Sequence, residues 1–121
     1  MQENWYFLEK LEAPDAHGIS AQVTVPSDSP WFAGHFPDNP VLPAVAQLAI
    51  ALDVIERASG RKLVPESIQR TKYRRIIRPD ERIHLTASPT DEQRLRYAFQ
   101  MRVGDETACK GTMQIKHKSH E

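Results

Sequence analysis

The stretch PAVAQLAIALDVIERASG, residues 43–60, decides the fold. Val45, Leu48 and Leu52 recur at helical spacing, and alanine, valine and isoleucine fill most of the positions between them. This pattern predicts a helix over residues 45–58 that is apolar on nearly every side and therefore buried, with those three side chains in the core. Gly60 is expected to end the helix, because glycine adopts the left-handed conformation after a helix C-terminus without steric cost.

Strands are predicted on both sides of this helix. Trp5 to Leu11 has the pattern of an edge strand or a short helix, and Ile19 to Val25 alternates as a half-buried strand does. Four further strand candidates span residues 65–77, 82–88, 94–103 and 107–118. The connections between these four are short, which predicts antiparallel neighbours in a meander. One helix of this kind needs a sheet that curls around it, or a second subunit that covers the rest.

Length and composition limit the class of protein. The 121 residues, of which 40% are hydrophobic and 26% charged, suit a single domain over residues 1–121. Sixteen basic residues balance sixteen acidic ones, which argues against a nucleic-acid partner bound through counterion release. The only cysteine, Cys109, excludes an internal disulfide. With no secretory signal pattern and no apolar run of roughly 20 residues, we expect a cytoplasmic protein without a membrane span.

The most specific motif precedes the helix, in WFAGHFPDNPVLPAVAQL, residues 31–48. Its prolines stiffen the backbone after His35 and hold the imidazole at a nearly fixed distance from the helix start, as a catalytic group requires. Pro43 suits the first helical turn, so the N–H of Ala44 is expected to be an unpaired donor at the positive end of the helix dipole. Such a helix terminus can polarise a carbonyl oxygen.

This motif resembles that of the β-hydroxyacyl-acyl-carrier-protein dehydratases (FabA/FabZ-like). Their pattern is Gly-His-Phe-Pro, two residues, Pro-Val, one residue, Pro-Gly and a long helix; here it runs from Gly34-His35-Phe36-Pro37 to Pro43-Ala44. The resemblance implies an α+β hotdog fold, in which an antiparallel sheet wraps around one long central helix. It also implies a dimer with active sites between subunits, acting on 3-hydroxyacyl thioesters in fatty-acid or related acyl-chain synthesis. The expected carrier of the thioester is acyl carrier protein or coenzyme A.

The same resemblance assigns roles to residues. His35 matches the family base that acts on C2 of the thioester, and the N–H of Ala44 matches the main-chain donor that polarises the carbonyl. Gly34, Phe36 and Val45 are expected to contact the substrate. No metal and no cofactor is expected.

The position of the family's helix acid is occupied by Ala49, which cannot donate a proton. The nearest carboxylate on the helix is Asp53, one turn further on, and it is a candidate for a displaced acid. The alternative is that Asp53 is solvated or ion-paired near Glu56 and Arg57.

Three functions therefore stay open. The first is a 3-hydroxyacyl thioester dehydratase, a lyase, with an atypical site. The second is a catalytically impaired or carrier-binding partner subunit that pairs with an active dehydratase, which Ala49 supports. The third is a hotdog thioesterase. We expect a homodimer or a larger homo-oligomer. Arg70, Lys72 and Arg74 alternate along one strand candidate, which suits either an acidic carrier protein or an ordinary solvent-facing strand.

Overall fold

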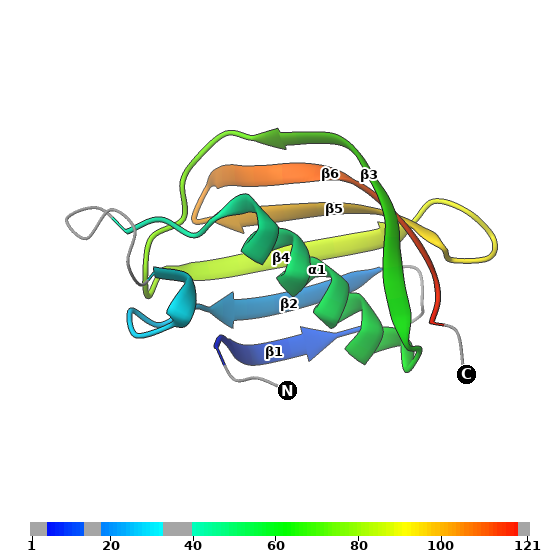
Figure 1. Ribbon diagram of the computed structural model, residues 1–121, viewed down its shortest axis with the longest axis horizontal. Helices are drawn as coiled ribbons and strands as arrows, with labels where there is room; N and C mark the ends of the chain where they lie inside the picture. Colours follow the sequence, from blue (N-terminus) through cyan, green and yellow to red (C-terminus); the bar gives the residue numbers. More distant parts are fainter. Residues whose placement is uncertain (1–4, 14–17, 33–39, 119–121) are drawn as a thin grey trace.

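The computed structural model describes residues 5–13, 18–32 and 40–118, and in them one long helix lies against a six-stranded antiparallel sheet (Figure 1). The elements in chain order are β1 (Phe7–Glu12), β2 (Ile19–Thr24), the 3-10 helix η1 (Pro30–Phe32), α1 (Ala44–Ser59), β3 (Leu63–Tyr73), β4 (Arg82–Pro89), β5 (Arg96–Val103) and β6 (Glu106–His117). The strand order across the sheet is β1-β2-β4-β5-β6-β3.

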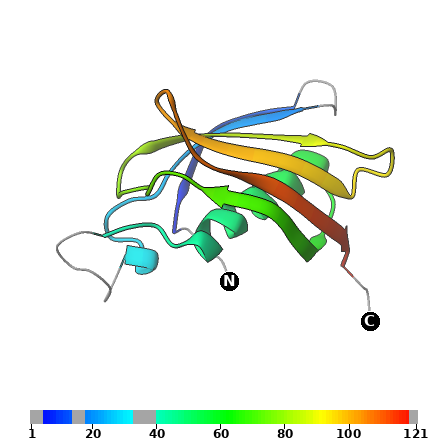
Figure 2. The same ribbon diagram turned by 90° about the horizontal axis from the view of Figure 1, so that it is seen from above.

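The sheet curves over the helix, as the view from above shows (Figure 2). Inward side chains of the middle strands, among them Val23, Leu85 and Met101, are fully buried beneath α1. The sequence prediction of an α+β hotdog fold, with an antiparallel sheet wrapped around one central helix, is confirmed. Within the described ranges, no helix has the length and apolar character needed to cross a membrane.

Only one side of α1 is covered by the sheet. Its buried side chains are those of Ala46, Gln47, Ile50, Ala51, Val54 and Ile55. Val45 is 60% exposed, so its predicted place in the core is wrong, and Leu48 and Leu52 are only half-buried. Helical periodicity shows which residues are apolar but not which element packs against each of them. A single sheet covers only one face of a helix. The other face of α1 is left apolar and uncovered in the single chain.

The end of α1 follows the sequence prediction. Gly60 has φ 71°, a left-handed conformation, and its N–H donates to the carbonyl of Glu56 at 2.9 Å. The Glu56 carboxylate in turn accepts the N–H of Leu63 at 2.8 Å. The last helical turn therefore fixes where β3 begins.

The position of β3 differs from the predicted meander. β4, β5 and β6 are consecutive antiparallel neighbours as expected, but β3 pairs with β6 and lies at the edge of the sheet, while β4 pairs with β2. The short connection between β3 and β4 does not make them neighbours, because it passes across the end of the sheet. The N–H of Asp80 on this connection donates to Val25, at 2.8 Å. Ile77 on it accepts the N–H of Leu42, also at 2.8 Å.

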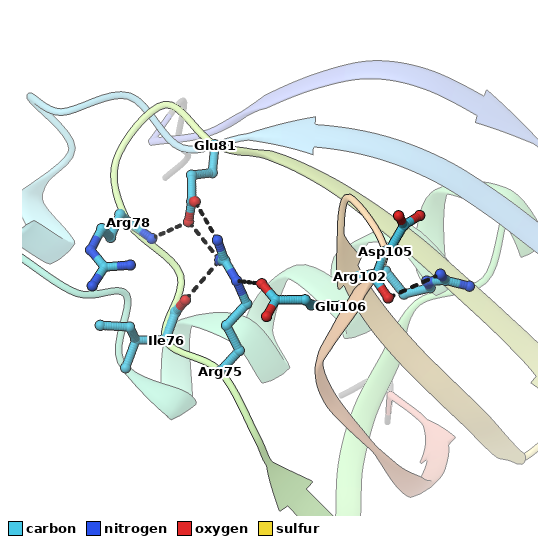
Figure 3. Close-up of polar contacts among 7 residues, drawn as sticks. All are labelled: Arg75, Ile76, Arg78, Glu81, Arg102, Asp105 and Glu106. Carbon is cyan, nitrogen blue, oxygen red and sulfur yellow. Dashed lines mark hydrogen bonds and ion pairs between the residues drawn. The ribbon is translucent and has the colours of Figure 1, made fainter.

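A cluster of charged side chains holds this connection in place (Figure 3). Arg75 donates two hydrogen bonds to the Glu81 carboxylate, at 2.9 and 2.7 Å, and a third to Glu106 at 2.6 Å. Hydrogen bonds from Arg75 lower the pKa of Glu81 below the usual glutamate value. The cluster joins the β3–β4 connection to the start of β6.

β3 contains an extra residue opposite Gly111 of β6. Gln69 pairs with Thr112 and Lys72 with Lys110, so Arg70 and Thr71 together face one residue, which is a β-bulge. Arg70 has φ 55° there, in the region that favours glycine. A Cβ on Gly111 would lie 2.6 Å from Oγ1 of Thr71 and 3.0 Å from its Cα. Gly111 is therefore required by the close approach of the bulge.

Candidate functional site

The three motif residues Gly34, His35 and Phe36 lie within 33–39, outside the described residues. Their predicted roles stay predictions. The chain is described up to Phe32 of η1 on one side of the motif and from Pro40 on the other. Pro40 to Pro43 leads directly into α1, so the described part of the site is the start of this helix.

The first turn of α1 presents unpaired N–H groups. Pro43 is extended, with φ −69° and ψ 158°, and its carbonyl accepts the N–H of Ala46 at 3.1 Å and of Gln47 at 3.2 Å. Among the described residues, the N–H groups of Ala44 and Val45 have no backbone acceptor. Ala44 is exposed. These donors lie at the positive end of the helix dipole, where they can bind and polarise a carbonyl oxygen.

The uncovered face of α1 continues from these donors. Val45, Leu48, Ala49 and Leu52 follow one another along it, and Ala49 is exposed. This face is apolar and supplies no proton donor before Asp53. The position that holds the family's helix acid is therefore open to the outside of the chain but carries only a methyl group.

Asp53 is bound by two neighbours. Its Oδ2 accepts hydrogen bonds from the phenol of Tyr6 and from Nε of Arg57, the latter at 3.1 Å. Burial, followed by the hydrogen bond to Asp53, raises the pKa of Tyr6, so the phenol stays protonated and donates at neutral pH. The structure thus places Asp53 in an ion pair with Arg57, the alternative that the sequence left open. Its role as an acid stays a prediction.

The segment that carries Tyr6 also contacts the residues leading into the motif. The ring of Trp5 packs edge-on against Trp31 of η1, with centroids 5.7 Å apart, and against Tyr6 at 4.9 Å. Trp31 is followed by Phe32 and then by residues 33–39. Tyr6 and Trp5 therefore link the middle of α1 to the entrance of the motif. Nothing in the sequence pattern indicated this partnership of Tyr6 with Asp53.

Gln47 is the second residue whose position the sequence did not predict. It is 4% exposed, on the buried face of α1, and its Nε2 donates to the carbonyl of Leu42 at 3.1 Å. Its Oε1 is buried and has no hydrogen-bond partner among the described residues. The amide fixes the backbone just before the helix start, and hence the direction of the free N–H groups. The signal for it was a lone polar residue on an otherwise apolar helix face.

No group of three metal-ligating side chains occurs among residues 5–13, 18–32 and 40–118. The described chemistry at the start of α1 is that of main-chain donors beside an apolar surface. This arrangement suits a ligand with a polarisable carbonyl and an apolar chain.

Comparison with known proteins agrees with this arrangement. A family model described as ApeI-like, ApeI dehydratase, matches residues 11–112. The 3-hydroxyacyl-[acyl-carrier-protein] dehydratase FabZ of Rickettsia typhi is 35% identical over 113 residues, which cover 83% of this chain and 77% of the relative. FabZ of Caldanaerobacter subterraneus subsp. tengcongensis is 34% identical over 88 residues, or 67% of this chain. The chain spans 60% of that relative's length.

Solved structures share the fold. A chain of the dehydratase heterocomplex ApeI:P from Xenorhabdus doucetiae superposes with a TM-score of 0.78 at 26% identity, covering 90% of this chain and 96% of that one. A mutant of thioesterase PA1618 from Pseudomonas aeruginosa has a TM-score of 0.58 at 19% identity, covering 88% and 78%, which shows the fold alone. The family match extends over both the sheet and the helix that presents the free N–H groups, and the chain therefore belongs to the ApeI-like dehydratase family of hotdog proteins.

Proposed function

We propose that this protein removes water from 3-hydroxyacyl thioesters held on acyl carrier protein or coenzyme A, in fatty-acid or related acyl-chain synthesis. The observation that carries the proposal is the start of α1. There the N–H groups of Ala44 and Val45 lack backbone acceptors among the described residues, beside an exposed apolar side chain. The FabZ relatives of this chain are dehydratases of acyl-carrier-protein thioesters by name, which supports the substrate class.

In this proposal the Ala44 N–H binds the thioester carbonyl and stabilises the negative charge that develops on its oxygen. His35 takes the proton from C2, the double bond forms between C2 and C3, and the bond from C3 to the hydroxyl oxygen breaks. The hydroxyl accepts a proton and leaves as water. Val45, with Gly34 and Phe36, contacts the acyl chain.

The proton for the leaving hydroxyl needs a donor. Ala49 cannot supply it, and we assign this role to a water molecule. Asp53 is the other candidate, since it is the nearest carboxylate on this side of the helix. Its hydrogen bonds with Tyr6 and Arg57 favour a tethering role instead.

The experiment is to incubate the purified protein with a 3-hydroxyacyl-acyl-carrier-protein and to follow the loss of water by mass spectrometry. We expect enoyl product, and we expect His35→Ala to lower the rate by about 10²- to 10⁴-fold, as for a lost general base. His117→Ala, at the end of β6, is the matched control and should keep the activity. Product formation that His35→Ala leaves unchanged would contradict the proposal, and release of free thiol without enoyl product would indicate a thioesterase.

A second function is favoured by the exposed alanine at position 49. The chain would then bind the thioester but depend on another dehydratase for the missing carboxylate. Ala49→Glu places a carboxylate on the uncovered face of α1, where the side chain has room. Turnover that is absent in the wild-type chain and present in Ala49→Glu would identify the protein as such a partner subunit. Equal turnover in both would exclude this second function.

A further inference from the structure

Two polar side chains among the described residues are buried, those of Ser29 and Gln47. The hydroxyl oxygen of Ser29 accepts the N–H of Trp31 at 3.4 Å. Gln47 donates through Nε2 to the carbonyl of Leu42, whereas its Oε1 meets no donor in the described part of the chain. Buried polar atoms in proteins nearly always have a hydrogen-bond partner. The oxygen of Gln47 therefore needs an explanation of its own.

The amide group of Gln47 is held in a single orientation. The carbonyl of Leu42 carries no hydrogen and can only accept, so the NH₂ group of Gln47 must face it. The Leu42 peptide is itself fixed, because its N–H donates to the carbonyl of Ile77 at 2.8 Å, and both residues are buried. The atom left over is thus a fixed acceptor, and the group that it lacks is a hydrogen-bond donor.

The helix itself does not supply this donor. The other buried side chains of α1 are all apolar, namely Ala46, Ile50, Ala51, Val54 and Ile55. The bond to Leu42 uses the NH₂ group alone, so the role of Gln47 in fixing the helix start does not account for its oxygen. An acceptor buried without a donor lowers stability. A few precisely placed polar groups in apolar surroundings are typical of a ligand site.

The oxygen lies at the same end of α1 as the N–H groups of Ala44 and Val45, which have no backbone acceptor among the described residues. Gln47 follows Ala44 by three residues, which is about 4.5 Å along the helix axis and one turn of its surface. Its side chain also reaches back toward the helix start, since it bonds to Leu42, five residues earlier. Main-chain donors and a fixed acceptor therefore lie within about one turn of each other.

We propose that Gln47 binds the 3-hydroxyl group of the thioester, with Oε1 accepting its hydrogen while the N–H of Ala44 binds the carbonyl oxygen. The inference rests on the proposed function, because it assigns a contact to the same substrate. The hydroxyl group is on C3, two carbons from the carbonyl, so both groups reach the helix start together. The hydroxyl oxygen keeps its lone pairs free for the proton with which it leaves as water.

This contact makes Gln47 a specificity residue. A saturated acyl chain and the enoyl product both lack a donor on C3, so either would leave Oε1 buried without a partner. A site built to accept a hydrogen bond from a hydroxyl group discriminates against ligands without that group. The protein should therefore prefer 3-hydroxyacyl chains to both.

Binding measurements test the contact without requiring turnover. They use the His35→Ala protein, in which the proposed base is absent and the substrate is not consumed. Calorimetric titration compares 3-hydroxyoctanoyl-acyl-carrier-protein with octanoyl-acyl-carrier-protein, so that contacts with the carrier and its arm are the same for both ligands. We expect the hydroxyacyl form to bind about 10-fold more tightly, the worth of one hydrogen bond to a buried group.

Substitutions at position 47 assign this preference to its oxygen. Gln47→Met keeps the length of the side chain without its polar atoms, and we expect it to bind both ligands equally. Gln47→Glu should keep the preference, because a protonated carboxyl group donates to Leu42 and accepts with its other oxygen. Gln22→Met, on the outer face of β2, is the matched control and should also keep it. Gln47→Leu takes the place of Gln47→Met if that variant fails to fold by circular dichroism.

The ratio of the two affinities decides the outcome. If Gln47 has only a structural role, or if its oxygen binds a buried water molecule, Gln47→Met will weaken both ligands alike and leave the ratio unchanged, which overturns the proposal. Equal binding of both ligands with Gln47 in place overturns it without any variant at that position, and leaves the proposed function standing. If neither ligand binds, the proposed function fails together with the contact.

Discussion

Asp53 illustrates how a residue's role depends on what surrounds it. By position it is the first carboxylate on α1 after the alanine at the acid position, and the sequence offers it as an acid. In the structure one of its oxygens accepts from Tyr6 and Arg57. These contacts tie the N-terminal segment to the helix. In this role Asp53 stabilises the fold as a hydrogen-bond acceptor and does not donate a proton to the substrate.

Replacing these partners separates the two roles. We expect Tyr6→Phe and Asp53→Asn each to lower the free energy of unfolding by about 1 kcal/mol, the usual net worth of a hydrogen bond, as measured by urea denaturation. We expect the dehydration rate to be largely unchanged in both. A rate that falls by about 10²- to 10⁴-fold in Asp53→Asn, but not in Tyr6→Phe, would instead identify Asp53 as the acid.

The sequence predicted those residues of the site whose position depends on the backbone geometry of a helix start. Pro43 at the helix start and Ala44 after it follow from the rules for helix termini, and the structure has both there. Tyr6 was not predictable, because its contact with Asp53 joins positions 47 residues apart. Local patterns carry no information on such a pair.

At the scale of elements, the bulge in β3 sets the local packing. The bulge at Arg70 and Thr71 brings Thr71 close to Gly111 of β6, where a side chain would not fit. We expect Gly111→Ala to lower the free energy of unfolding by about 1–3 kcal/mol, the usual cost of overpacking, as measured by thermal or urea denaturation. Gly18→Ala is the control, because among the described residues a Cβ there meets only Oγ of Ser88, at 3.9 Å. Equal stability of the two variants would contradict the close approach.

Helix and strand positions followed largely from sequence, whereas the order of strands did not. The helix was expected over 45–58 and spans Ala44–Ser59; the strand expected at 65–77 spans Leu63–Tyr73. The predicted meander is wrong for β3, because the length of a connection does not determine which strand the next segment pairs with. The hydrogen bonds of Leu42 and Asp80 with distant carbonyls decide that path.

For the molecule as a whole, the cluster around Arg75 links stability to pH. Since Arg75 lowers the pKa of Glu81 in the folded state, the unfolded state binds more protons below the usual glutamate pKa. The stabilisation is therefore complete above that value and is lost as the pH falls through the lower, folded pKa.

Glu81→Gln should reveal this dependence. We expect it to lower the free energy of unfolding at pH 7 and to flatten its decline between about pH 5 and pH 3, as followed by urea denaturation across the range. Glu92→Gln, an exposed glutamate between β4 and β5, should keep the wild-type profile. A Glu81→Gln profile that is parallel to the wild-type one would show that the pair does not contribute.

The whole arrangement leaves one helix face and one sheet edge uncovered, which the sequence anticipated in part. An apolar helix that one sheet cannot enclose predicted either a curled sheet or a second subunit. The sheet is curled in the structure, but the side chains of Val45 and Tyr73 are still exposed. The face on which Tyr73 lies, and its register, come only from the pairing of β3 with β6.

The two residues opposite Gly111 also bear on how the chain can change in length. Strands seldom tolerate the loss of a residue, because every side chain after the deletion then points to the opposite face of the sheet. Here Gln69 and Lys72 are already spaced one residue too far apart for a regular ladder with Thr112 and Lys110. A deletion of Arg70 would restore an even ladder and leave the downstream faces unaltered, so this strand can be shortened where others cannot.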